Sequence, residues 1–106
     1  MSGLKSRNKG ASAEREASKL WHEVGFPFAR RKLSQYQEKG GIDLENTESF
    51  KVQVKSGKKI NVWQALREVE EEAKRQEIPL AMIKRDRTDW IVVISWKNFV
   101  KVLNPK

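Results

Sequence analysis

The sequence predicts an α/β domain with a central mixed β-sheet flanked by helices, and three patterns indicate it. Between residues 13 and 24, apolar residues recur three and four apart, as on one face of a helix. Between residues 42 and 54, apolar and polar residues alternate, as in strands with one buried face. The run "WIVVIS" is continuously apolar, which is typical of a buried strand. These patterns follow one another in the order αβββαββα, within the 106 residues of a single domain.

The boundaries of these elements follow from residues that start or stop helices and strands. Gly25 ends the first helix, which Ser12 caps unless it begins a turn earlier. Pro27 restricts the first strand to an early or edge position. Asn61 and Ser95 cap the second and third helices. We therefore expect helices at 10–24, 62–76 and 96–103, and strands at 26–31, 42–46, 50–55, 80–85 and 90–95.

The chain is basic, with 22 Lys and Arg against 14 Asp and Glu and a net charge of +8. We expect residues 1–9 to form a flexible basic arm and residues 32–41 a mobile loop, whereas the glutamates from 68 to 72 form a solvated helix face. A basic surface of this kind suits a polyanion such as nucleic acid. A purely solubilising charge is the alternative.

Composition excludes several kinds of site. Without cysteine there is no disulfide or thiolate zinc site, and the lone His22 builds no histidine site, so any metal must be held by oxygen. The N-terminus lacks the apolar stretch of a signal peptide, and no run approaches the roughly 20 apolar residues of a membrane span. We expect a cytoplasmic protein, with His22 on the surface and without a catalytic role. Core or dimer-interface positions, rather than base stacking, are expected for Trp21, Trp63, Trp90 and Trp96.

The alternating segment "GIDLENTESFKVQVKSG" predicts a hairpin whose register follows from its apolar residues. With "TES" as the loop, Leu44 lies opposite Val52 and the apolar residues share one face. The same register places Asp43 opposite Gln53, with Lys55 two residues further on. A four-residue loop would mix the two faces. Taken alone, this polar face is also what any half-buried hairpin presents to water.

Three neighbouring features argue for more than a solvated face. The pair Gly40-Gly41 precedes Asp43 and allows close approach of the backbone. The basic turn "SGKK" follows Lys55 directly. Glu14 lies beside the apolar stripe of the first helix, so it can face inward over the sheet.

Phosphodiester cleavage uses the residue types that are gathered here. It needs a hard divalent cation, an activated water molecule and positive charge to neutralise the transition state. Asp43 and Glu14 can supply carboxylates to Mg²⁺, and Gln53 an amide oxygen. Lys55 is a compact cation that can orient water or stabilise pentacovalent phosphorus.

A glutamate on an N-terminal helix, an aspartate, a short hairpin and an x-Val-Lys strand together resemble the PD-(D/E)xK nuclease superfamily. Within it, "KGASAEREASKLW", "GGIDLE" and "KVQVKSGKKI" are similar to archaeal-type and phage Holliday junction resolvases, and the resemblance extends from about Asn8 to Ser95. It implies a restriction-endonuclease-like core, Mg²⁺ as cofactor with Mn²⁺ substituting, a homodimer, and cleavage of branched DNA.

The resemblance also implies residue roles. Asp43 would be the central metal ligand, joined by Gln53 at the position usually held by an acid and by the carbonyl of Val54. Glu14 would complete the site directly or through water, and Lys55 would be the catalytic lysine. Arg15 would contact phosphate, and we expect further DNA contacts from the basic residues around the loop and the turn: Arg30, Arg31, Lys32, Lys39, Lys58 and Lys59.

The chain departs from the family pattern at two positions. Ile42 replaces a proline, which is a minor change, and Gln53 replaces an acid, which removes a negative charge and should weaken metal binding. Glu45 or Glu48 can supply the missing carboxylate, although Glu45 is more simply the cross-strand partner of Lys51. Two other functions stay open: a nicking or flap-type nuclease, and an inactive DNA-binding member of the fold.

Overall fold

The computed structural model describes residues 2–32 and 41–104, with the backbone alone for residues 2–10. Its elements follow the predicted order αβββαββα. The helices are α1 (Ser2–Glu23), α2 (Val62–Glu72) and α3 (Trp96–Leu103), and the strands are β1 (Arg30–Arg31), β2 (Leu44–Glu45), β3 (Phe50–Gly57), β4 (Ile78–Arg85) and β5 (Ile91–Val93).

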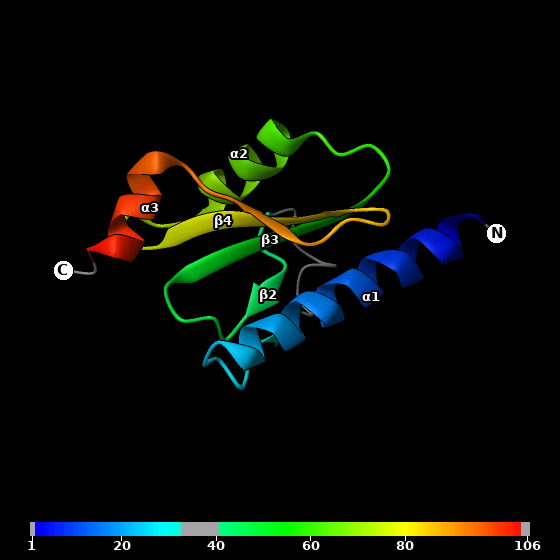
Figure 1. Cartoon of the computed structure of the whole chain (residues 1–106), viewed down its shortest axis with the longest axis horizontal. Coiled ribbons are helices and arrows are strands. Elements are labelled where there is room, and N and C mark those ends of the chain that lie inside the picture. Colours follow the sequence, from blue (N-terminus) through cyan, green and yellow to red (C-terminus); the bar gives the residue numbers. More distant parts are fainter. Residues whose placement is uncertain (1, 33–40, 105–106) are drawn as a thin grey trace.

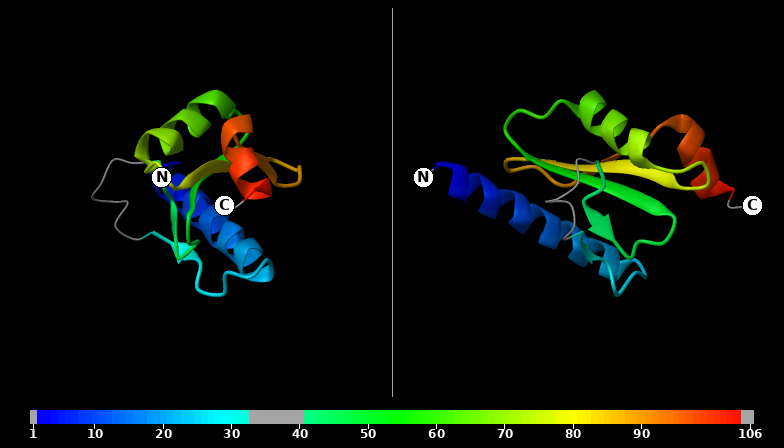
Figure 2. Two further views of the ribbon diagram at one scale, coloured as in Figure 1. Left: turned by 90° about the vertical axis from the view of Figure 1, so that its left-hand side faces the viewer. Right: turned by 180° about the vertical axis from the view of Figure 1, so that it is seen from behind.

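A mixed three-stranded sheet forms the centre of the molecule, as the sequence predicts (Figure 1). The strand order is β3-β4-β5, with β3 parallel to β4 and β4 antiparallel to β5. Figure 2 shows α1 and α2 on opposite sides of this sheet. Because β3 and β4 run parallel, the C-terminal ends of both strands meet at the same end of the sheet.

The middle of strand β3, from Val52 to Val54, is buried on both faces, although the sequence of the strand alternates between apolar and polar residues. Val52 and Val54 face α1 and pack in one core cluster with Ala13 and Ala17. The other face of the strand is covered by α2, and Gln53 on that face is only 2% exposed. The polar face expected to be open to water is therefore partly enclosed.

Strand β2 pairs with β1, not with β3 as the hairpin predicts. Arg30 lies opposite Glu45 in a separate two-stranded sheet. Among the described residues no ladder joins β2 to β3, so the register that pairs Asp43 with Gln53 is wrong. Asn46 and Glu48 adopt left-handed conformations, with φ of 64° and 53°, and turn the connection so that β2 lies against β1.

Helix α1 begins at Ser2 rather than near residue 10, so Ser12 lies inside the helix and is not its cap. The segment expected as a flexible arm is therefore helical from Ser2 onward. It contains no proline or β-branched residue, and extending an existing helix adds one hydrogen bond per residue. The loop expected over 32–41 lies outside the described residues except at its ends. No helix of the described chain is long and apolar enough to cross a membrane.

The other helix ends follow the predicted signals more closely. Gly25, with φ of 108°, follows α1 in the conformation that favours glycine. Asn61 caps α2, and its side chain accepts a hydrogen bond from the Gln64 amide at 3.0 Å; Ser95 caps α3 in the same way. Helix α2 ends at Glu72 rather than 76 because the backbone of Ala73 is extended.

The first strand is shorter than predicted, since the Ala29 amide donates to the Phe26 carbonyl and makes residues 26–29 a turn. Two of the four tryptophans pack against the core: Trp21 and Trp90. Trp63 and Trp96 do not, because they are 76% and 73% exposed.

Candidate active site

Asp43 is fixed at the edge of β3 that does not pair with β4. Its amide donates to the Val52 carbonyl at 2.8 Å, and its own carbonyl accepts from the Lys32 amide at 2.8 Å. Its carboxylate oxygen Oδ2 accepts from the Val54 amide at 2.7 Å, in the place where a neighbouring strand would offer a carbonyl. The predicted convergence of Asp43 with the "QVK" segment therefore occurs, but it depends on this side chain and not on a hairpin ladder.

The environment of Asp43 opposes its ionisation. Burial raises the pKa of its carboxyl from 3.8 to about 6, and the hydrogen bond from Val54 works in the opposite direction. The charges of Glu14 and Glu68 also raise this pKa, whereas the nearby cation Lys55 lowers it. These residues are thus its electrostatic neighbours, and they come from α1, α2 and β3.

Glu14 faces inward from α1, as expected, and is buried. The Nε of Arg31 donates to its Oε1 at 2.8 Å, and the two side chains are only 15% and 12% exposed. Arg31, which we expected among the phosphate contacts, thus lies inside the candidate site and compensates the charge of Glu14.

A second acid reaches the site from α2, where we expected only a solvated face. The Nε2 of Gln53 donates to Glu68 Oε1 at 2.6 Å, and the Nζ of Lys55 lies 3.7 Å from the same oxygen. One feature of the sequence indicates this contact: Glu68 lies one turn after the buried Ala65, toward the inner side of an amphipathic helix.

Gly41 explains why a glycine precedes Asp43. A Cβ at this position would lie 2.5 Å from the backbone carbon and oxygen of Glu68 and 2.7 Å from the amide nitrogen of Val69. Only glycine lets the chain pass this close to α2. The close backbone approach predicted for the pair is therefore confirmed at Gly41, while Gly40 lies outside the described residues.

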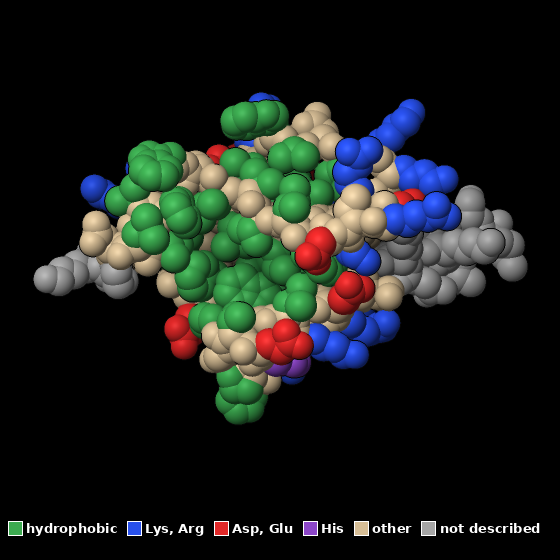
Figure 3. Space-filling model, in the orientation of Figure 1, with side chains coloured by type: hydrophobic (Ala, Val, Ile, Leu, Met, Phe, Trp, Pro, Cys, Tyr) green, Lys and Arg blue, Asp and Glu red, His purple; other side chains and the backbone are tan. Residues whose placement is uncertain are grey.

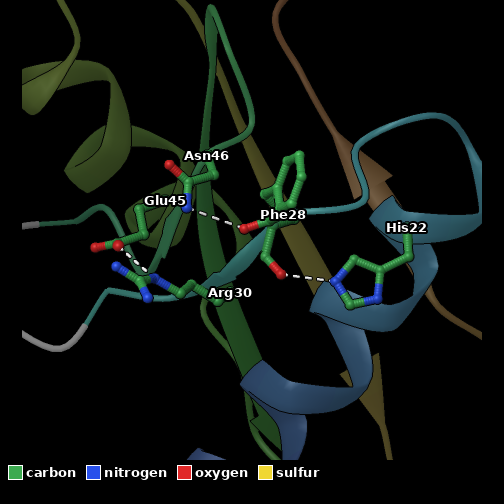
Figure 4. Close-up of polar contacts among 6 residues, drawn as sticks. His22, Phe28, Arg30, Glu45 and Asn46 are labelled. Atoms are coloured by element: carbon green, nitrogen blue, oxygen red, sulfur yellow. Dashed lines mark hydrogen bonds and ion pairs between the residues drawn. The ribbon is translucent and has the colours of Figure 1, made fainter.

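The predicted pair of Glu45 with Lys51 is wrong. Glu45 lies opposite Arg30 in the β1–β2 ladder and accepts from its Nε at 2.6 Å, as Figure 4 shows. Lys51 instead pairs with Glu77 at 3.2 Å. Glu48 is exposed in the turn before β3.

Figure 4 also shows how the turn before β1 is fixed. The exposed His22, at the end of α1, hydrogen-bonds through Nε2 to the carbonyl of Ala29 at 2.7 Å. The Nδ2 of Asn46 donates to the Phe28 carbonyl at 3.0 Å. His22 is a surface residue as expected, and these two bonds hold β1, and with it Arg31, in place.

The predicted DNA-contacting residues divide into several groups. Arg15, Lys58 and Lys59 are exposed, Lys32 is half-buried, and Lys39 lies outside the described residues. Parallel pairing of Gly57 with Arg85 brings the turn after β3 next to the β4–β5 turn. Figure 3 shows Lys and Arg side chains gathered at that end of the molecule.

Two exposed cations were not predicted from the sequence: Arg85, which ends β4, and Arg87 in the β4–β5 turn. Lys58, Lys59 and Arg85 line a hollow of about 780 Å³. The strand order was the missing information, because only parallel pairing of β3 with β4 brings these residues together.

Within the described residues, no three Asp, Glu, His or Cys side chains lie close enough to hold a metal ion together. Mg²⁺ in proteins usually takes one or two carboxylates and completes its octahedron with carbonyl oxygens, waters or substrate phosphates. The oxygen donors around Asp43 suit that chemistry, since they include its carboxylate, the Glu68 carboxylate and the Gln53 amide.

Comparison with known proteins gives no relative. No family model matches the chain, and neither a curated protein nor a solved structure resembles it closely enough to count as a match.

Proposed function

We propose that this protein is a metal-dependent endonuclease with a restriction-endonuclease-like core, and that it cleaves phosphodiester bonds in branched DNA, above all in four-way junctions. The observation that carries the proposal is the hydrogen bond from the Val54 amide to the Asp43 carboxylate. It brings together the Asp and the Gln-Val-Lys segment, which lie ten residues or more apart and which the chemistry requires side by side.

In this proposal Asp43, the amide oxygen of Gln53 and the carbonyl of Val54 would hold Mg²⁺ or Mn²⁺. When bound, the cation supplies Lewis-acid polarisation of a phosphate oxygen and lowers the pKa of a water molecule. The raised pKa of Asp43, about 6, supports this role, because a carboxylate held against burial and neighbouring acids gains from a cation.

The remaining residues orient the substrate and complement its charge. Lys55, with its side chain 45% exposed, can donate to a water molecule or to a phosphate oxygen. Glu14, whose charge acts on Asp43, is held in place by its largely buried ion pair with Arg31. The exposed cations Arg15, Lys58 and Lys59, together with Arg85, would bind backbone phosphates.

A four-way junction is cut on two strands, so the proposed activity needs two sites. A two-fold homodimer supplies them with one kind of chain. We propose such a dimer, acting in the cytoplasm on cellular or viral DNA.

The test uses purified protein, Mg²⁺ or Mn²⁺, and end-labelled four-way junctions, flaps and linear duplexes. Paired, symmetric cuts in the junction are expected, with no cleavage in EDTA. Cutting of flaps with junctions untouched would favour the flap or nicking nuclease. Binding without cleavage of any substrate would favour an inactive DNA-binding member of the fold, which the glutamine at position 53 makes worth testing.

A further inference from the structure

We infer that Glu68 of α2 supplies the carboxylate that this chain lacks at position 53, and that Glu68 and Asp43 are the two acids that face the divalent cation. This rests on the proposed function and identifies a residue that the nuclease pattern does not include. It begins from the amide of Gln53, which is 2% exposed and donates to Glu68 Oε1 at 2.6 Å.

This hydrogen bond fixes the orientation of the Gln53 amide relative to the Glu68 carboxylate. Because the amide nitrogen of Gln53 points at the carboxylate, its oxygen is on the other side of the amide group. A neutral amide at 53 also removes the repulsion that two carboxylates 2.6 Å apart would suffer. Gln53 can therefore lie beside Glu68 of α2, whereas a glutamate at position 53 would be repelled by it.

Glu14 and Glu68 both disfavour the ionisation of Asp43, but they differ in their charged partners and in their exposure. Glu14 already has a close guanidinium partner in Arg31 at 2.8 Å, and both side chains are largely buried. Glu68 has a longer ion pair, 3.7 Å from Lys55, and its side chain is 39% exposed. Of the two, Glu68 is the acid whose charge is less compensated and more accessible to an incoming cation.

The surroundings of Glu68 leave its side chain accessible to solvent and hold its backbone in place. With Lys55 and Lys59 it lines a hollow of about 210 Å³, large enough to admit solvent and a phosphate group. Its backbone is in close contact with the chain at Gly41. Glu68 therefore lies on a rigid wall of an open space next to the proposed catalytic lysine.

The test measures cation binding without DNA, by thermal melts and by calorimetric titration with Mn²⁺ and Mg²⁺. Glu68→Gln keeps a hydrogen-bond acceptor for Gln53 and should preserve the fold. Loss of residues that merely support metal ligands costs about 10- to 100-fold in affinity, so Glu68→Gln should weaken cation binding at least 10-fold. Glu71→Gln, an exposed acid on the same helix, is the matched control and should bind like the wild type.

The exchange variant gives the sharpest result. Gln53→Glu alone should destabilise the cation-free protein, because two acids then meet across the bond. Gln53→Glu combined with Glu68→Gln keeps one acid, one amide and the same net charge, and it should bind the cation within a few-fold of the wild type.

Three results would overturn the inference: no cation binding by the wild type, wild-type affinity in Glu68→Gln, or an exchange variant that stays as weak as Glu68→Gln. The first of these results would contradict the proposed function as well, but other results separate the two. Cation binding that depends on Glu68, without cleavage of any DNA, would contradict the nuclease alone. Junction cleavage that is indifferent to Glu68→Gln would contradict the inference alone.

Discussion

Two opposing effects act on the carboxylate of Asp43. The Val54 amide holds its carboxylate in place, while burial and two neighbouring acids make its charge unfavourable. Groups perturbed in this way concentrate at functional sites, where stability is given up for chemistry. The cost can be measured directly as a dependence of folding stability on pH.

We predict that Asp43→Asn stabilises the cation-free protein at pH 8 but not at pH 4. The folded pKa, about 6, lies above the ordinary value of 3.8, so the folded state retains a proton that the unfolded chain releases. The free energy of unfolding therefore falls as pH rises from about 4 to about 6, and remains lower above that range. This difference between the folded and the unfolded pKa of Asp43 corresponds to about 1–3 kcal/mol of unfolding free energy.

Thermal and urea unfolding between pH 4 and pH 8, in EDTA, tests this. Asp89→Asn, at an exposed position in the β4–β5 turn, serves as the control and should change stability little at any pH. If Asp43→Asn and Asp89→Asn give parallel pH profiles of stability, folding does not oppose the ionisation of Asp43, and the prediction is wrong.

For Lys55 we predict a defect in chemistry and not in binding. Lys55→Ala should bind junction DNA nearly as well as the wild type but cut it about 10²-fold more slowly, the scale of losing one preorganised electrostatic group. Lys51→Ala, four residues earlier on the same strand and paired with Glu77, is the matched control. Single-turnover cleavage with saturating protein separates the two effects, and full cleavage by Lys55→Ala would remove this residue from the site.

At the scale of elements, Gly41 is the point at which the segment that carries Asp43 packs against the helix that carries Glu68. We predict that Gly41→Ala destabilises the protein by about 1–3 kcal/mol, because its Cβ would press on backbone atoms that cannot rotate away. Urea unfolding measures the loss. Unchanged stability would mean that the segment and α2 separate easily, and the contact between Gln53 and Glu68 would then lack its rigid support.

The order and type of the elements could be predicted because each has its own local signal. Helix caps such as Asn61 and Ser95, the terminating Gly25 and the apolar periodicities all act within a few residues of the chain. The partner of β2 could not be predicted this way. Alternation says which residues share a face, but it does not say whether the next strand or an earlier one lies alongside.

The candidate site could be predicted in part for the same reason. Asp43, Lys55 and Glu14 carry residue types and positions that the sequence displays. Glu68 was missed because one acid in a run of glutamates is most simply a solvated residue, and only the packing of α2 on β3 reveals its contact with Gln53. Arg31 was expected to contact DNA, because its burial depends on pairing with Glu14, which is distant in sequence.

At the scale of the whole molecule, the basic and apolar surfaces are separated. In Figure 3, Lys and Arg side chains gather at the end that holds the β4–β5 turn, while hydrophobic side chains cover much of the face over α3 and β5. Along α3, the exposed Trp96, Phe99, Val100 and Leu103 recur at helical spacing on one side. The proposed DNA contacts and the proposed subunit contact therefore have different parts of the surface available to them.

We predict that DNA binding is strongly salt-dependent and that the basic end of the sheet accounts for much of this dependence. With about six phosphate contacts, affinity should fall by roughly 10³ between 50 and 200 mM salt. Replacing Lys58 and Lys59 by Gln should lower the slope of log K against log salt by about two, since each phosphate contact contributes about 0.9.

The control for this prediction replaces Lys74 and Lys97 by Gln, which makes the same change in net charge. Both are exposed, and both lie near the opposite end of the sheet, where β4 begins and β5 ends. At about 0.1–0.15 M salt, within this range, exposed charges farther apart than about 8–10 Å are largely screened, so the control should leave the slope nearly unchanged. Equal slopes for the two double variants would mean that the protein attracts DNA through its net charge of +8 alone. A smaller slope for the Lys58 and Lys59 variant alone would instead locate the phosphate contacts beside the candidate site, where cleavage requires them.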